Sequence, residues 1–143
     1  EYTEQMDVTQ GKLSMGFRCG SDDVPALIMA NLMFGGSSNS KLFLNVREKL
    51  SLCYYASSQY ARSKGILTVS SGIETKDYDR ALEEILRQLQ LICDGDITAE
   101  ELRSAKEALL SNLRATHDSP GAIEGYFDSV IADINELKGR IIK

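Results

Sequence analysis

The sequence predicts one α+β domain in which helices pack on one face of an antiparallel-rich sheet. Two observations carry this prediction: the order strand, two helices, hairpin and several helices, and the period-two alternation of the segments assigned as strands. A chain of 143 residues with 43% hydrophobic residues can bury one sizeable core. We therefore expect residues 1–143 to form a single domain. Because the first residue is Glu1 rather than Met, we also expect this domain to be a fragment of a longer protein.

The first strand and the first helix are marked by periodicity and by capping residues. Leu13, Met15 and Phe17 alternate with small or polar residues, which predicts a strand with one buried face. A turn rich in Ser and Asp follows, and Pro25 suits the first turn of a helix. The nearly all-apolar segment Ala26–Phe34 is then predicted to form a buried helix against the sheet.

A second helix and a hairpin are predicted next. The helix should run from about Ser40 to Leu50, because Leu42, Phe43 and Val46 form one apolar stripe with Leu50. Two segments rich in Tyr, Ser, Thr and β-branched residues follow, with a short turn sequence between them. We interpret them as an antiparallel hairpin formed by Leu52–Ala61 and Gly65–Ile73.

The remainder of the chain has helical periodicity. A helix is predicted over Lys76–Cys93, followed by a break rich in Asp and Gly. Thr98 and Glu101 fit a capping box at the start of another helix, which should run close to Thr116. A last helix is predicted to begin with Ser119 as its N-cap. Its apolar stripe is formed by Ile123, Phe127, Val130, Ile131, Ile134 and Leu137.

Charge and cysteine content narrow the classes of partner. A formal net charge of -5 and a pI near 4.9 argue against binding to nucleic acid or to anionic membrane surfaces. No apolar run approaches the roughly 18 to 20 residues that cross a bilayer. Cys19, Cys53 and Cys93 are widely spaced and odd in number, which favours reduced, buried thiols over a disulfide framework. A cytoplasmic location is expected.

One segment, from Phe34 to Ser58, carries a specific resemblance. It resembles the second, zinc-free half of the inverzincin zinc peptidases typified by insulinase, pitrilysin and the mitochondrial processing peptidase. The resemblance extends in pattern from about Leu13 to Ile131, and it implies a metallopeptidase-like α+β half-domain. The matching residues are Gly35, Gly36, Ser40, Leu42, Phe43, Val46, Arg47, Glu48, Lys49, Leu52, Tyr54 and Ser58.

Arg47 and Tyr54 are the candidate substrate-binding residues that this resemblance implies. In active members of the family, an Arg and a Tyr of the zinc-free half reach across an enclosed chamber toward the zinc site. A guanidinium can donate several hydrogen bonds to a peptide, and a phenol can donate to a developing oxyanion. Ordinary structural roles are the alternative: a cation in the last turn of a helix for Arg47, and a half-buried strand aromatic for Tyr54.

A catalytic metal site is not expected on this chain. The family binds zinc through H-x-x-E-H, whereas this sequence has a single histidine, His117, which suits the end of a helix. Zinc is therefore implied only in a complementary half or partner chain. Cys53 lies next to Tyr54 but has no histidine nearby in the sequence, so we interpret it as a packing residue.

Gly35 and Gly36 are interpreted as a structural turn, with a left-handed helix cap favoured over a turn that brings backbone amides to a ligand. The glycines and serines before Lys41 also leave open an anion site at the start of the Ser40 helix, although the glycine that a phosphate loop needs before its lysine is missing.

Two functions from different classes follow from these observations. The first is a zinc-free half of an insulinase-family metallopeptidase, which binds and positions a peptide substrate for hydrolysis at a zinc site held elsewhere. The second is a catalytically inactive family member that acts as a scaffold or assembly subunit. The edge of the hairpin, at Tyr55, Ser57 and Gln59 or on the opposite face, could additionally pair with an extended peptide, and the sequence leaves open which edge is free.

Overall fold

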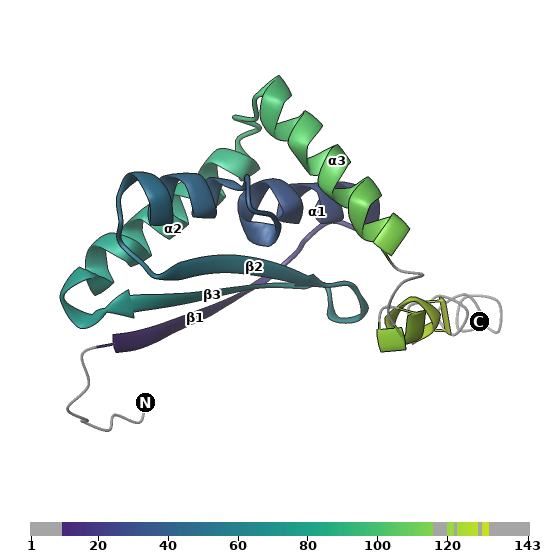
Figure 1. Cartoon of the computed structure of the whole chain (residues 1–143), viewed down its shortest axis with the longest axis horizontal. Coiled ribbons are helices and arrows are strands. Elements are labelled where there is room, and N and C mark those ends of the chain that lie inside the picture. Colours follow the sequence, from purple (N-terminus) through teal and green to yellow (C-terminus); the bar gives the residue numbers. More distant parts are fainter. Residues whose placement is uncertain (1–9, 116–119, 122, 129, 132–143) are drawn as a thin grey trace.

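The computed structural model describes residues 10–115, 120–121, 123–128 and 130–131. It confirms the predicted α+β class, with helices on one side of a three-stranded antiparallel sheet (Figure 1). The elements are β1 (Gln10–Arg18), α1 (Val24–Asn31), the π-helices η1 (Leu32–Gly36) and η2 (Leu42–Lys49), β2 (Tyr55–Ala61), β3 (Ile66–Glu74), α2 (Tyr78–Cys93) and α3 (Ala99–Ala115). Short 3-10 turns, Arg62–Lys64 and Thr75–Asp77, follow β2 and β3.

The sheet has the order β1-β3-β2, with every neighbour antiparallel. The predicted hairpin is confirmed as β2 and β3, and Gly65 closes their connection in the left-handed region at φ 60°. Successive side chains of each of the three strands point to opposite faces of the sheet. In one cross-strand row, Ser14, Ser70 and Ser57 are exposed on the outer face. The opposite face carries the buried side chains of Leu13, Ala56, Val69 and Ile73.

Helix α1 begins as its capping residues indicated. The Asp23 carboxylate accepts a hydrogen bond from the Ala26 amide at 3.1 Å, and Pro25 lies in the first turn. The segment is α-helical to Asn31 and then widens into the π-helix η1, which the sequence did not predict. A π-helix differs from an α-helix by one residue in its hydrogen-bond spacing, and the five residues of η1 are too few for an apolar pattern to show this difference.

Gly35 and Gly36 do not form the left-handed cap that we predicted. Neither has positive φ, and both lie inside η1. Gly35 is needed for close approach: a Cβ there would lie 2.7 Å from both the amide nitrogen and the Oγ of Ser58. A Cβ at Gly36 would lie 2.6 Å from the Asn31 side chain. Gly35 therefore lets η1 touch β2, and Gly36 lets η1 pack against the end of α1. The backbone of both glycines is part of a π-helix rather than a turn that presents its amides to a ligand.

The main core lies between the sheet and the helices η1, η2 and α2. It contains two residues that are fully buried on η2, Leu42 and Val46, and it extends to Leu13 on β1. Helix α2 presents Ala81 and Ile85 to the same core. Because packing in this core holds η2 against the sheet, it also sets the position of residues 50–54, which connect η2 to β2.

Helix α3 packs mainly on η1 and α1, in a second core that contains Leu32, Met33 and Ala105 (Figure 1). The predicted capping box at its start is confirmed: the Thr98 amide donates to Glu101 Oε2 at 2.8 Å, and the Glu101 amide donates to Thr98 Oγ1 at 3.1 Å.

Residues 123–128 are helical, within the last helix that we predicted. Its proposed N-cap, Ser119, lies outside the described residues, as does His117. None of the helices in the described ranges combines the length and hydrophobicity needed to cross a bilayer.

Candidate functional site

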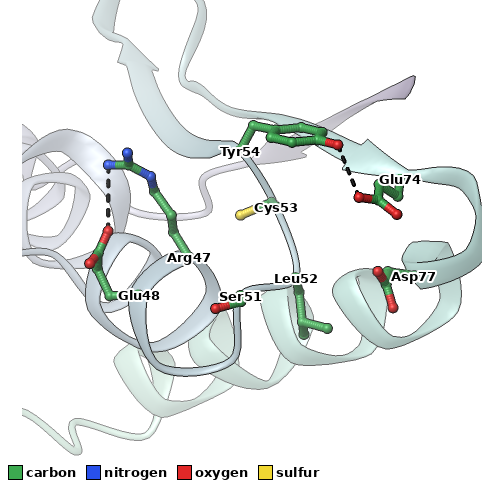
Figure 2. Close-up of a pocket in the computed structure, with 8 residues that line it drawn as sticks. All are labelled: Arg47, Glu48, Ser51, Leu52, Cys53, Tyr54, Glu74 and Asp77. Carbon is green, nitrogen blue, oxygen red and sulfur yellow. Dashed lines mark hydrogen bonds and ion pairs between the residues drawn. The ribbon is translucent and has the colours of Figure 1, made fainter. Parts of the chain in front are cut away.

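An open hollow of about 400 Å³ lies where η2, the start of β2, the end of β3 and the start of α2 come together. Figure 2 shows its walls. Both residues that the sequence proposed for substrate binding line this hollow. The lining residues are Arg47, Glu48, Ser51, Leu52, Cys53, Tyr54, Glu74 and Asp77.

Arg47 lies in the last turn of η2 with its side chain 41% exposed. Its guanidinium carbon lies 4.7 Å from the centre of the Phe43 ring, within the range of a cation–π interaction. The nearest carboxylate is that of Glu48, at 3.7 Å between Nη1 and Oε1. This exposed pair is long and weak, so the guanidinium keeps free donors that a ligand could use.

Tyr54 lies just before β2 and is 50% exposed. Its hydroxyl donates to Glu74 Oε1 at 3.0 Å, while Glu74 Oε2 lies 2.7 Å from the Lys76 ammonium. The hydrogen bond to Glu74 raises the pKa of Tyr54 above its ordinary value. Lys76, and after it the Tyr54 hydroxyl, lower the pKa of the Glu74 carboxyl. Tyr54 is therefore a neutral phenol beside an ionised carboxylate at neutral pH.

Arg47 and Tyr54 border the same hollow, but their polar ends turn apart. Figure 2 shows the guanidinium directed toward Glu48 and the phenol directed toward Glu74, on opposite sides. The two side chains are thus brought to one cavity without meeting in it. A ligand that accepts the Tyr54 proton would draw the phenol away from Glu74.

The backbone between the two residues makes a sharp turn that sequence reasoning missed. Ser51 has φ 51°, the single positive φ of a non-glycine residue in the described chain. The amide of Ser51 donates to Arg47 O at 3.1 Å, and that of Leu52 donates to Val46 O at 3.0 Å, which closes the π-helix. Serine gave no signal for this conformation, because the sequence of such a turn usually shows Gly or Asn.

Cys53 has the packing role that we predicted. It is half-buried against the main core, and burial raises the pKa of its thiol above the ordinary value, despite the opposing effects of Ser71 and Arg47. A thiol with a raised pKa is a poor nucleophile. All three cysteines are free, but the expectation that they are buried is wrong: Cys19 and Cys53 are only partly buried, and Cys93 is exposed at the end of α2.

The anion site considered at the start of the Ser40 helix is not formed. Ser40 is fully buried, and the Lys41 ammonium lies 2.7 Å from Glu101 Oε1 with both side chains largely buried. A lysine already neutralised inside the fold is not available to an anion. Within the described ranges, no three His, Cys, Asp or Glu residues are grouped so that they could hold a metal ion.

Glu74 is the polar neighbour that sequence reasoning did not identify. It lies 20 residues from Tyr54 in the sequence, and antiparallel pairing of β2 and β3 brings the two together at one end of the sheet. The only available signal was the hairpin itself, because antiparallel pairing places the last residues of β3 opposite the residues that precede β2. The exact partner depends on a register that the sequence left undetermined.

Comparison with known proteins shows the family to which the chain is similar. A family model described as the peptidase M16 inactive domain matches residues 1–109. The curated "Probable inactive metalloprotease YmfF" of Bacillus subtilis is 42% identical over 123 residues, which cover 83% of this chain and 29% of that protein. "Uncharacterized zinc protease YmxG" of the same organism is 30% identical, with 83% of this chain and 30% of that protein covered.

A solved structure agrees with the sequence comparisons. The crystal structure of a conserved protein from Enterococcus faecalis matches with a TM-score of 0.73 and 34% identity, over 86% of this chain and 30% of that chain. The chain therefore spans less than a third of the length of the curated relatives it matches. By both sequence and fold, it belongs to the family of peptidase M16 inactive domains.

Proposed function

We propose that this chain is the zinc-free half of an M16 metallopeptidase and that it binds and positions an extended peptide with Arg47 and Tyr54. The observation that carries the proposal is the hollow shared by these two exposed side chains, at the positions that match the family's Arg and Tyr. Zinc would belong to a complementary half or partner chain, because the described residues bring no set of metal ligands together.

The chemistry of the hollow suits a peptide better than a small anion. Arg47 can donate from several N–H groups to peptide carbonyls, and the half-exposed Tyr54 can donate one hydrogen bond when its hydroxyl is free. Leu52 contributes an apolar wall, while Glu48 and Asp77 add negative charge. These carboxylates would repel an anion, whereas they would not repel an uncharged peptide backbone.

The test uses the complete protein, either the full-length parent chain or the assembly that contains the zinc-carrying half. We expect Arg47→Ala to lower kcat/KM for fluorescein-labelled casein by roughly 100-fold, the order seen when a donor to the transition state is removed. Tyr54→Phe, which deletes only the hydroxyl, should lower it in the same direction. Unfolding curves should match those of the wild type, since both side chains are substantially exposed.

Two control variants keep this test specific. Lys49→Ala removes an exposed cation two residues from Arg47, and Tyr78→Phe removes an exposed phenol at the start of α2. Neither residue lines the hollow. Both controls should retain wild-type kcat/KM. Wild-type turnover in Arg47→Ala would contradict the assignment of Arg47.

A catalytically inactive scaffold is the second candidate function. It is favoured by the similarity to a relative named as an inactive metalloprotease, and by the polar ends of Arg47 and Tyr54, which turn apart onto Glu48 and Glu74. The complete protein would then bind no zinc and would bind casein peptides equally well with and without Arg47. Zinc content and peptide affinity of the complete protein, measured together, separate the two functions.

A further inference from the structure

We infer that Glu74 restrains Tyr54 in a resting position, so that a peptide must compete with this carboxylate for the phenol before Tyr54 can serve the site. The inference rests on the proposed function and concerns how its site is controlled. Two contacts on one carboxylate carry it: the Tyr54 hydroxyl on Oε1 at 3.0 Å and the Lys76 ammonium on Oε2 at 2.7 Å.

The Glu74 carboxylate is held in place from two directions. Glu74 is the last residue of β3 and lies opposite Gln10 of β1, so its backbone is fixed by the sheet. Lys76 belongs to the turn Thr75–Asp77 that follows immediately, and its ammonium takes up the second carboxylate oxygen. The acceptor for Tyr54 is therefore positioned by secondary structure as well as by an ion pair.

This hydrogen bond determines what the phenol can do. A tyrosine hydroxyl has one proton to donate, and here that proton is donated to a carboxylate. Hydrogen bonds to an ionised acceptor are roughly twice as strong as those between neutral groups. A neutral peptide carbonyl is the weaker acceptor, so Glu74 reduces the fraction of Tyr54 available to a peptide. The ordinary pKa of a tyrosine already lies well above neutral pH, and the pKa of Tyr54 is raised further by its hydrogen bond to Glu74, so the hydroxyl is protonated and can act as a donor.

Among the residues that the structure describes, none restrains Arg47 comparably. Its carboxylate neighbour, Glu48, is 3.7 Å away, and its other contact is the face of the Phe43 ring. Figure 2 shows the guanidinium and the phenol on opposite sides of the hollow. Of the two proposed peptide-binding residues, Tyr54 is thus the one whose availability the fold controls, and Glu74 is its positioning residue.

Glu74→Gln in the complete protein tests this inference, because the side chain keeps its shape while the acceptor loses its charge. Fluorescence anisotropy with fluorescein-labelled casein peptides should show roughly three- to tenfold tighter binding, the gain expected when a charge-assisted bond is weakened. The double variant Glu74→Gln/Tyr54→Phe should bind no tighter than Tyr54→Phe alone, since the gain acts through the phenol. Glu100→Gln, an exposed glutamate paired with Arg103 on α3, is the matched control and should change nothing.

A second readout needs no peptide. The pKa of Tyr54, followed through the NMR signal of its ring carbon and assigned by the loss of that signal in Tyr54→Phe, should fall toward the ordinary tyrosine value in Glu74→Gln. An unchanged pKa would overturn the inference, as would weaker peptide binding by Glu74→Gln. If the pKa falls as expected but Tyr54→Phe does not alter peptide binding, the restraint stands and the proposed role of Tyr54 fails.

Discussion

Gly35 shows how a single missing side chain positions the site. The π-helix η1 meets β2 at this residue, and a Cβ would come within 2.7 Å of the Ser58 amide nitrogen and of Leu42 Cδ1. Ser58 in turn donates to Asn31 Oδ1 at 2.7 Å, which ties the strand to the end of α1. A displacement of β2 away from η1 would therefore also shift Tyr54, which directly precedes β2.

We predict that Gly35→Ala destabilises the fold by about 1 to 3 kcal/mol, the usual cost of forcing an extra carbon into a packed site. The backbone nitrogen of Ser58 cannot move aside as a flexible side chain would. Gly16→Ala is the control, because a Cβ at this position of β1 meets nothing within 4 Å. Urea unfolding measures both variants, and equal stabilities would contradict the close-approach role of Gly35.

At the scale of elements, one ion pair joins the start of α3 to the start of η2. Glu101 closes the capping box of α3 and also receives the Lys41 ammonium at 2.7 Å, with exposed side-chain fractions of 19% and 7%. Burial by itself would raise the pKa of Glu101, but Lys41 and the Thr98 donors outweigh it, so that the pKa is lowered. The pair thus holds α3 against the layer that carries Arg47.

We predict that Glu101→Gln lowers the free energy of unfolding by about 3 kcal/mol at pH 7, because Lys41 is left buried without a counter-charge. Glutamine also serves in a capping box, so the substitution isolates the ion pair from the cap. Glu100→Gln, one residue earlier and exposed, should leave the stability unchanged.

The pH dependence of this difference follows from the lowered pKa of Glu101. A carboxyl whose pKa is lower in the folded state contributes stability that is fully present above its unfolded value, about 4.5, and lost as the pH falls through the folded value. The stability difference between wild type and Glu101→Gln should therefore be constant near neutral pH and shrink in the acidic range below about pH 4.5. A difference that grows on acidification would contradict the ion pair.

Across the whole molecule, the features set by neighbouring residues were predictable from the sequence, and those set by distant contacts were not. The capping box at Thr98 and the hairpin around Gly65 depend on a few adjacent residues, and both are confirmed. The strand order β1-β3-β2 depends on pairs that lie between 48 residues (Arg18 and Ile66) and 64 residues (Gln10 and Glu74) apart, for which a single sequence contains no signal. The π-helical geometry of η1 and η2, which both contact β2 and α2, was missed because a short apolar segment does not distinguish a π-turn from an α-turn.

The candidate site divides in the same way. Arg47 and Tyr54 could be proposed from the sequence because the motif that contains them is contiguous, and the structure places both at one hollow. Glu74 was missed because only the sheet brings it to Tyr54, and the αL turn at Ser51 was missed because serine rarely marks one. The sequence therefore supplied the two candidate ligand-binding residues, while the structure added the Glu74 partner of Tyr54 and the turn between the two residues.

Photo-crosslinking in the complete protein tests most directly whether this hollow binds peptide, because it does not depend on catalysis. The photoreactive residue p-benzoylphenylalanine would replace Tyr54, or Tyr78 as an exposed control outside the hollow. We predict that irradiation with labelled casein peptides gives an adduct at position 54, lost on competition with unlabelled peptide, and none at position 78. A competable adduct at position 78 with none at position 54 would contradict the account.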